Sequence, residues 1–575
     1  MGCMRLSVGS TIDDDHAREV FRAALDAGIT LFDTAAAYGE GDKDLHRNER
    51  VLADALGPKK SAVEIVTKCG MRRPQGKWRP DGRRKTILED AELSRRALGV
   101  DALDLLLLHA PDPKTSFETS VRALATAKDS GVARRVGLSN VKLGQLEQAW
   151  GLVPIDAVQL AVSPFEEDAV RGGVVERCFE LGIRVLIHSP LGGPKKHAKL
   201  AEHDELEWIA MQHGVTPQTI VLAWLYGLHP LVVPLPGATR VETARQAANA
   251  ATLQLRDDER AILDDAFAIG RLLRTPRSER APRSPKRKVT LFVGIPAAGK
   301  TSSHDGDAIR LSRDERGGTL KQLAGALGEA LHEGAAHVLM DATYPTRAQR
   351  SHVVETAWEH GAGVEVRWFD TPLHEAQINA VDRIVARHGR LLTPEELALE
   401  AKTDPNMFPP MAQYRFRDTF EVPDAREGFS IERIPFQRRP VEGHDRVGLV
   451  VDLEALVDVA RFPRAPYAGK VDAIEALRED EGPVLVVGWL PAVGAGRLAH
   501  EDVLEGFASW KTDWSFAYCP HEAGPPKCWC RKPLPGLVVP WLRLRRIDPR
   551  RSTYVATSAA SRTLADALGM RTREP

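Results

Sequence analysis

Four side chains in the first part of the chain have the types needed to protonate a carbonyl oxygen: Asp33, Tyr38, Lys68 and His109. A phenol is a poor acid at neutral pH because its pKa is about 10, and a nearby ammonium group lowers that pKa. Asp33 can hold the Lys68 ammonium by pairing with it, and His109 can orient a carbonyl oxygen near the Tyr38 hydroxyl. The set therefore predicts a catalytic site for carbonyl reduction.

A glycine-rich segment further along the chain has the spacing of a phosphate-binding loop. Residues 294–301, with the sequence Gly-Ile-Pro-Ala-Ala-Gly-Lys-Thr, follow an apolar run from Val289 to Val293 and fit the P-loop pattern. Glycines let the backbone N–H groups surround phosphates, Lys300 reaches the β and γ oxygens, and Thr301 can hold Mg²⁺. We therefore predict an ATP site that contains Gly294, Gly299, Lys300 and Thr301.

Two carboxylates follow this loop at positions that suit group transfer. Asp314 lies shortly after the loop, where a carboxylate can accept the proton of an attacking hydroxyl group. Asp341 ends a buried run and fits either a metal contact or a substrate contact. The pattern predicts phosphoryl transfer, with Lys300 and Asp314 as catalytic residues.

Three of the six cysteines gather with a histidine near the end of the sequence. Cys519, His521, Cys528 and Cys530 form two close pairs, and three thiols with one imidazole suit tetrahedral Zn²⁺. Four protein ligands leave no open position, so we predict a structural zinc rather than a catalytic one. Six cysteines in 575 residues are too few for a disulfide scaffold, which indicates a reducing, cytoplasmic location.

The elements that must position the first set of residues have the pattern of a parallel barrel. Residues 1–270 alternate short apolar runs with amphipathic stretches, and seven or eight such βα units form a closed barrel. Side chains at the carboxyl ends of barrel strands point into the active-site mouth, which would bring Asp33, Lys68 and His109 together. Within this pattern, Thr216 as N-cap and Pro217 at the first helical position predict a helix that reaches Leu228.

The composition changes after the predicted barrel. Residues 271–287 are rich in arginine, and Pro276, Pro282 and Pro285 predict an exposed linker without helix. This linker is either a solvated spacer or an arm that contacts nucleic-acid phosphates. Two further α/β domains are predicted after the linker, at 288–440 and 441–575, because each of these segments begins with a strand pattern.

Charge and hydropathy exclude two classes of protein. The 78 Lys and Arg residues nearly balance the 79 Asp and Glu residues, so the chain is not strongly basic overall. No apolar run approaches the ~20 residues that cross a bilayer, so we expect no membrane partner.

The 1–270 segment resembles the aldo-keto reductases. The resemblance rests on the following strings: Gly28 to Thr34 with Tyr38-Gly39, Val66 to Lys68, Asp104 to His109, Val136 to Asn140, Ser189 to Gly192 and Val233 to Ala238. It implies NADP(H)-dependent reduction of a small aldehyde or ketone, with Tyr38 as the acid and Lys68, Asp33 and His109 in support. It also implies that the cofactor contacts Ser139, Asn140, Gln159, Ser189, Leu191, Gly237 and Arg240, with Arg240 on the 2′-phosphate.

The 288–440 segment resembles the polynucleotide 5′-kinases. Besides the P-loop, the matching strings are Leu311 to Arg316, Val338 to Thr343, Trp368 to Leu373, Phe420 to Pro423 and Glu427 to Ser430. The resemblance implies Mg²⁺-dependent transfer of the ATP γ-phosphate to a 5′-hydroxyl DNA or RNA end, with Asp314 as base and Asp341 on the substrate side. It also implies a lid arginine on the donor phosphates, either Arg383 or Arg387.

The 441–575 segment resembles haloacid-dehalogenase-type (HAD-type) phosphatases of the sugar-bisphosphate and histidinol-phosphate branch. The specific string is the Cys-His set followed by Arg531-Lys532-Pro533, and Asp452 stands where the nucleophile would be. Thr557 and Ser561 replace the acids that would bind Mg²⁺, which removes most of the carboxylate charge from that site. We therefore expect a folded domain without phosphatase activity.

The predicted fold class is α/β multidomain: a (β/α)8 TIM barrel, a P-loop parallel-sheet kinase, and a small Rossmann-like HAD-type domain with a zinc loop. A kinase followed by a phosphatase is the order of some end-healing enzymes, so nucleic-acid repair is expected by analogy. Two alternatives remain. One is a metabolic reductase fused to a small-molecule kinase, and the other is a repair scaffold whose barrel and phosphatase-like domains only bind.

Overall fold

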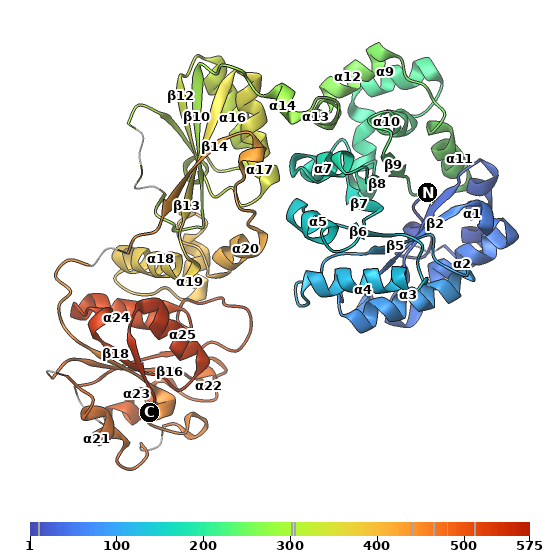
Figure 1. Cartoon of the computed structure of the whole chain (residues 1–575). Helices are drawn as coiled ribbons and strands as arrows, with labels where there is room; N and C mark the ends of the chain where they lie inside the picture. Colours follow the sequence, from blue (N-terminus) through green and yellow to red (C-terminus); the bar gives the residue numbers. More distant parts are fainter. Residues whose placement is uncertain are drawn as a thin grey trace. The chain divides into compact units, whose positions relative to one another are not determined.

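The computed structural model describes residues 1–9, 12–300, 303, 306–438, 441–463, 466–479, 481–510 and 513–575. The chain folds into two compact units, Met1–Ala281 and Pro282–Pro575, which are described separately (Figure 1). No helix in the described part of the chain has the length and apolar character needed to cross a membrane.

The first unit contains a nearly closed parallel barrel. Its sheet has the order β1-β2-β5-β6-β7-β8-β9, and every neighbouring pair is parallel. Gly2 forms parallel bridges with both Gly237 and Asp33, so residues 1–3 bridge the gap between the two edge strands. The prediction of eight strands is therefore corrected to seven strands and a bridging segment. The strands are β1 (Leu31–Asp33), β2 (Glu64–Cys69), β5 (Leu105–Leu108), β6 (Val136–Ser139), β7 (Ala157–Ala161), β8 (Arg184–His188) and β9 (Val232–Leu235).

Helices cover the outside of this barrel (Figure 1). All four residues of β5 are buried leucines, as expected for a parallel strand with both faces covered. The predicted helix after Thr216 is confirmed, but it spans Pro217–Tyr226 and so ends two residues before the predicted Leu228. The Thr216 side chain accepts a hydrogen bond from the Thr219 N–H. The helices are α1 (Asp14–Asp26), α2 (Arg47–Leu56), α3 (Arg84–Leu98), α4 (Phe117–Asp129), α5 (Leu143–Trp150), α6 (Asp168–Arg171), α7 (Val174–Glu180), α8 (Gly193–Lys196), α9 (Asp204–His213), α10 (Pro217–Tyr226), α11 (Val241–Ala250) and α12 (Asp257–Ala266).

The arginine-rich segment after the barrel differs from the prediction. Its first part forms α13 (Ala268–Arg274) and α14 (Arg277–Arg280), so the expectation of an exposed linker without helix over 271–287 is wrong there. Pro276 is the N-cap of α14, a position where the missing N–H of proline breaks no helical bond. Arg277 is buried, and its Nη2 donates to the Arg171 carbonyl at 3.4 Å, which fixes the segment to the first unit.

The second unit begins with a five-stranded parallel sheet of order β11-β12-β10-β13-β14. Its central strand β10 (Arg287–Val293) leads directly into the predicted phosphate loop. The remaining strands are β11 (Ile309–Ser312), β12 (His337–Asp341), β13 (Ala362–Asp370) and β14 (Ser430–Pro435). The helices are α15 (Arg313–Arg316), α16 (Leu320–His332), α17 (Arg347–Glu359), α18 (Leu373–His388), α19 (Pro394–Glu400) and α20 (Met411–Thr419).

A second five-stranded parallel sheet follows, with the order β17-β16-β15-β18-β19. The two sheets share a hydrophobic core in which Val381 and Ile384 of α18 pack in one cluster with Trp529 and Val538. The strands are β15 (Leu449–Asp452), β16 (Val484–Trp489), β17 (Ser515–Cys519), β18 (Thr553–Val555) and β19 (Arg571–Arg573). The helices are α21 (Lys470–Glu475), α22 (Pro491–Gly494), α23 (His500–Ala508), α24 (Val538–Arg545) and α25 (Ala559–Leu568).

Candidate functional site

The four residues predicted to reduce a carbonyl meet at the carboxyl edge of the barrel. Asp33 ends β1, Lys68 lies in β2 and His109 directly follows β5. The Lys68 Nζ donates to Asp33 Oδ1 at 2.7 Å and to the Tyr38 hydroxyl at 2.9 Å. All four side chains are buried, so these bonds operate away from bulk water.

Burial sets the protonation states of the acid and its neighbours. It raises the pKa of Tyr38 to about 12, and the Lys68 charge only partly offsets this effect. The expectation that Lys68 would bring this pKa below its usual value is therefore wrong for the free protein. Burial opposes the charge of Lys68, but Asp33 and Tyr38 together raise the pKa of Lys68 above the usual value. Near neutral pH, Lys68 is thus a cation beside a phenol that keeps its proton.

His109 is held neutral beside the phenol. Burial and then the Lys68 charge lower the pKa of His109 well below its usual value. Its ring packs edge-on against Tyr38, with the centroids 5.8 Å apart, and its buried Nδ1 has no hydrogen-bond partner in the described residues. A neutral imidazole at this place can orient a carbonyl oxygen without competing with Tyr38 as the acid.

Part of the predicted cofactor set joins this cluster. The Asn140 Nδ2 donates to the His109 carbonyl and to Ser139 Oγ, both at 3.1 Å. The Gln159 Nε2 donates to Asp33 Oδ1 at 2.6 Å, so this side chain also holds the carboxylate that pairs with Lys68. Asn140 has a φ of 57°, a left-handed conformation that is uncommon for non-glycine residues but that asparagine adopts more readily than most.

The other predicted cofactor residues follow β8 and β9. Ser189 has a φ of 53° and lies next to His188, whose Nε2 is 3.2 Å from Asn140 Oδ1. Leu191 is half-buried, whereas Gly237 and Arg240 are exposed. Arg240 is the N-cap residue of α11, where a helix N-terminus favours a phosphate group.

The loop predicted to bind phosphate, residues 294–300, is held in shape by hydrogen bonds from three side chains. Thr371 Oγ1, Asn379 Nδ2 and Gln413 Nε2 donate to three loop carbonyls, at 3.1, 3.0 and 2.9 Å respectively. Gly299 has a φ of 89°, and a Cβ at Gly294 would lie 3.0 Å from the Phe369 carbonyl, so the backbone of both positions requires glycine. Thr301, predicted to hold Mg²⁺, lies outside the described residues.

Lys300 lies inside this loop as a buried cation bonded to neutral groups. Its Nζ donates to the carbonyls of Gly294 at 2.9 Å and Ile295 at 3.0 Å. Burial lowers the pKa of Lys300 to about 8, although the charges of Asp341 and Asp314 act in the opposite direction. A buried ammonium group has lost the water that would stabilise its charge. An anionic ligand would therefore stabilise Lys300 by pairing with it.

The charges of the two predicted carboxylates, Asp314 and Asp341, both act on Lys300. Desolvation and the charge of Asp341 raise the pKa of Asp314, which makes Asp314 a stronger base than an ordinary aspartate. Asp341 is buried at the end of β12 and accepts hydrogen bonds from Arg310 Nε and Nη2. Glu315 binds Arg310 Nη1 at 2.6 Å, so this neighbour of Asp314 is directed to another partner.

The structure distinguishes the two arginines that the sequence left open. Arg383 donates to Asn406 Oδ1 at 2.7 Å, and its charge lowers the pKa of both Lys300 and Asp314. Arg387 is half-exposed and pairs with Asp404. Arg383 is therefore the arginine whose charge acts on Lys300 and Asp314.

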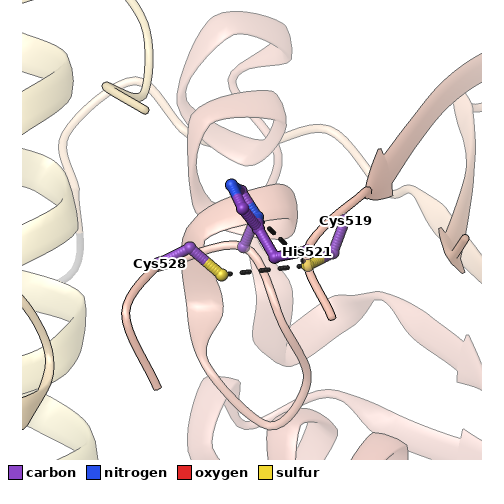
Figure 2. A group of neighbouring side chains, drawn as sticks. Cys519, His521 and Cys528 are labelled. Carbon is purple, nitrogen blue, oxygen red and sulfur yellow. Dashed lines mark hydrogen bonds between the residues drawn. The ribbon is translucent and has the colours of Figure 1, made fainter. Parts of the chain in front are cut away.

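Four potential metal ligands converge near the end of β17. Figure 2 shows Cys519, His521 and Cys528 directed toward one another, and Cys530 completes the group. The distance between the Cys519 and Cys528 sulfurs is 3.8 Å, and the His521 Nδ1 lies 3.6 Å from Cys519 Sγ and 3.3 Å from Cys530 Sγ. Tetrahedral Zn²⁺ with Zn–S near 2.3 Å and Zn–N near 2.0 Å requires edges of about 3.8 and 3.5 Å. The three printed distances are close to these edges, and all four ligand atoms lie within 4.8 Å of one another.

Asp452 occupies the position predicted for a phosphatase nucleophile, but its carboxylate is fully engaged. Lys532 Nζ donates to Oδ1 at 2.7 Å, and the Tyr554 hydroxyl donates to the same oxygen at 3.1 Å. The Thr557 N–H and hydroxyl both donate to Oδ2, at 2.8 and 2.9 Å. The side chain is completely buried, and each of its two oxygens accepts two of these hydrogen bonds.

Two residues beside the barrel mouth were missed by the sequence reasoning. Arg73 and Trp78 lie in the segment that follows β2, where β3 (Met71–Arg72) pairs with β4 (Arg79–Pro80). The Trp78 ring contacts both Tyr38 and His109, at centroid distances of 6.3 and 5.7 Å. Their place directly after the strand that carries Lys68 was the signal in the sequence that could have identified them.

Comparison with known proteins identifies the first unit. Residues 1–268 match the model of the aldo/keto reductase family. An aldo-keto reductase of Strobilurus tenacellus is 28% identical over 293 residues, which cover 45% of this chain and 84% of that protein. Among solved structures, a thermostable aldo-keto reductase in complex with epalrestat is 29% identical and covers 46% of this chain and 93% of its own, with a TM-score of 0.40. An aldo-keto reductase from Klebsiella pneumoniae in complex with NADPH is 23% identical. The match covers 48% of this chain and 91% of that protein, with a TM-score of 0.40. The first unit thus contains an aldo/keto reductase domain.

Proposed function

We propose that the aldo/keto reductase domain of residues 1–268 reduces a small aldehyde or ketone with NADPH. The observation that carries this proposal is the buried contact of 2.9 Å between Lys68 Nζ and the Tyr38 hydroxyl. Because burial keeps the Tyr38 proton in place, the phenol can donate that proton only when negative charge develops on a nearby oxygen.

The residues around the mouth fit a nicotinamide dinucleotide phosphate. Ser139, Asn140 and Ser189 lie at the carboxyl ends of β6 and β8, and two of them have the left-handed backbone described above. Arg240 and the N-terminus of α11 together provide a cation and backbone N–H groups for a 2′-phosphate. The bound cofactor would supply the hydride.

Residues of the chain then donate the proton and stabilise the charge that remains. Tyr38 donates its proton to the carbonyl oxygen, and the Lys68 ammonium stabilises the phenolate that remains. Asp33 keeps Lys68 charged and is itself held by Gln159. His109, held neutral, orients the oxygen beside Tyr38.

Replacement of the acid tests this proposal. Tyr38→Phe should lower the turnover of NADPH-dependent aldehyde reduction by about 100-fold or more, because the proton donor is lost. Tyr226→Phe is a matched control, because its hydroxyl bonds the Pro234 carbonyl at 3.4 Å and lies outside the four-residue cluster. Equal turnover in the parent and Tyr38→Phe would place the chemistry elsewhere.

We propose a second function for the first sheet of the second unit, ATP-dependent phosphorylation of a 5′-hydroxyl nucleic-acid end. The supporting observation is Lys300, a buried cation bonded only to carbonyls in the described residues, inside a glycine-dependent loop at the end of a central parallel strand. Asp314 would deprotonate the hydroxyl, Asp341 would contact the substrate, and Arg383 would bind the donor phosphates. Mg²⁺ would offset the charge on the phosphates. Nucleic-acid end repair is the corresponding biological role that we propose.

Asp314→Asn tests the base. This variant keeps the size of the side chain but loses its basicity, so transfer of labelled phosphate to a 5′-hydroxyl oligonucleotide should collapse while ATP still binds. Glu315→Gln is the matched control, because that carboxylate binds Arg310. Transfer at the parent rate in Asp314→Asn would remove the base assignment. Far better phosphorylation of a small alcohol than of an oligonucleotide would favour a small-molecule kinase.

We propose that the second sheet of this unit carries a structural Zn²⁺ and no phosphatase activity. The distances among Cys519, His521, Cys528 and Cys530 support the metal. The four hydrogen bonds to Asp452 support the loss of hydrolysis, because a nucleophile must have a free oxygen.

A further inference from the structure

A buried cation beside the barrel mouth has no role in the proton transfer derived above. Arg73 is only 5% exposed, and its Nε and Nη1 atoms are buried without a hydrogen-bond partner in the described residues. Its guanidinium carbon lies 3.9 Å above the centroid of the Trp78 ring. Burying a guanidinium group with unpaired N–H groups costs free energy of folding. This cost is explained if a ligand, rather than another residue of the chain, accepts hydrogen bonds from those N–H groups.

The acids near Arg73 are already engaged elsewhere. Asp42 accepts a hydrogen bond from the Arg73 backbone N–H at 2.6 Å, not from the side chain. Glu40, whose charge acts on Arg73, accepts a hydrogen bond from the Gly9 N–H at 2.8 Å. No ion pair to Arg73 forms among the residues that the structure describes. The positive charge of Arg73 is therefore not balanced by an ion pair in the described residues.

Arg73 is also close enough to act on the reacting centre. Trp78, on which it stacks, contacts both the acid Tyr38 and its neighbour His109. The Arg73 charge is one of the influences that lower the pKa of His109. A substrate whose carbonyl oxygen meets Tyr38 would thus extend along Trp78 toward the guanidinium.

We propose that Arg73 is a substrate-binding residue that selects carbonyl compounds carrying a carboxylate. This inference rests on the proposed reductase function. The carboxylate supplies the missing acceptor for the Arg73 N–H groups, and Trp78 supplies an apolar wall for the carbon skeleton between the two ends. A neutral aldehyde of the same shape would leave the guanidinium unpaired and would be a poorer substrate.

A pair of matched aldehydes tests the selection. We expect the parent to prefer 4-carboxybenzaldehyde over its neutral methyl ester in kcat/KM. Arg73→Gln keeps a hydrogen-bond donor but loses the charge, and it should lower kcat/KM for the acid by about 10- to 100-fold. The ester should change less than about threefold, which also shows that the variant is folded. Arg79→Gln, an exposed position in β4, is the matched control, and Arg73→Lys should restore part of the preference.

A binding measurement separates this inference from the proposed reductase function. Calorimetric titration with 4-methylbenzoate should show binding to the parent and its loss in Arg73→Gln, without cofactor or turnover. If neither aldehyde is reduced but this binding depends on Arg73, the reductase function fails and the carboxylate site stands. If both aldehydes are reduced and Arg73→Gln affects the acid no more than the ester, the carboxylate site is refuted.

Discussion

Replacing Asp33 with asparagine would test whether the Asp33 carboxylate stabilises the buried Lys68 cation inside the barrel. Asp33 accepts hydrogen bonds from Lys68 at 2.7 Å and from Gln159 at 2.6 Å, and all three side chains are buried. Asp33→Asn preserves the shape and one acceptor oxygen but removes the negative charge. Lys68 would then be a buried cation without its counter-charge.

The size of the effect follows from this geometry. Removing one member of a buried ion pair costs about 3–5 kcal/mol, and we expect the lower end, about 3 kcal/mol, because the amide oxygen still accepts a hydrogen bond. In the parent, the pKa of Lys68 is raised, so its contribution to stability is present below the ordinary lysine pKa and is lost as pH rises through the raised value. In Asp33→Asn the pKa of Lys68 should fall instead, because burial is then unopposed by Asp33. The loss of stability should therefore be larger near pH 6 than near pH 10.

Native-state hydrogen exchange read by mass spectrometry measures this loss on peptides of the first unit, while peptides of the second unit serve as an internal reference. Asp14→Asn is the matched control, because Asp14 pairs with Arg47 at 2.9 Å in a partly exposed position. Surface pairs of this kind contribute about 0–1 kcal/mol. The reasoning would be refuted if Asp33→Asn destabilised the first unit no more than Asp14→Asn, or equally at both pH values.

Three further predictions concern the second unit. Purified protein should contain one zinc per chain by elemental analysis, and Cys528→Ser should lose it; a parent without zinc would contradict the ligand set. Arg383→Gln should raise the KM for ATP by about 10-fold or more, whereas Arg387→Gln, in which Asp404 loses its partner, should change it less than about threefold; equal effects would remove the distinction. The parent should release no phosphate from 3′-phosphate ends, and release that Asp452→Asn abolishes would show an active phosphatase.

The sequence predicts where the proposed catalytic side chains of the barrel lie, but it does not predict their pKa values. Asp33, Lys68 and His109 are assigned to strand ends by hydrophobic runs alone, and the structure brings them together. The pKa of Tyr38 depends on burial, which the identity of its neighbours does not reveal. Arg73 was missed for the same reason, because its lack of partners is a property of the folded loop.

The predicted fold differs from the observed fold at two places, and each difference has a local cause. The barrel has one strand fewer than predicted because residues 1–3 make single bridges, which carry no strand pattern in a sequence. The segment after the barrel was predicted to be an exposed linker because of its prolines and arginines. Pro276 lies at a helix start, however, and the Arg277 side chain donates to the Arg171 carbonyl, which is distant in the sequence and not indicated by any local pattern.

The two buried lysines, Lys68 in the candidate reductase site and Lys300 in the candidate kinase site, differ in their neighbours. This difference explains why an anionic ligand is expected next to the ammonium group of only one of them. Lys68 is paired with Asp33, so its charge is already satisfied. Lys300 bonds two neutral carbonyls, and burial lowers its pKa to about 8. A bound polyphosphate would raise that pKa, so MgATP binding at pH 8 should take up about half a proton per chain.

Calorimetric titrations in buffers of different ionisation enthalpy measure this proton uptake directly. Lys300→Arg is the control, because its guanidinium is charged throughout this pH range and should take up no proton at that position. The uptake should also vanish near pH 6, where Lys300 is already protonated in the free protein. Binding of MgATP to the parent at pH 8 without proton uptake would show that the phosphates do not lie against Lys300. The buried lysine would then be a structural part of the loop, bonded to Gly294 and Ile295 with or without a nucleotide.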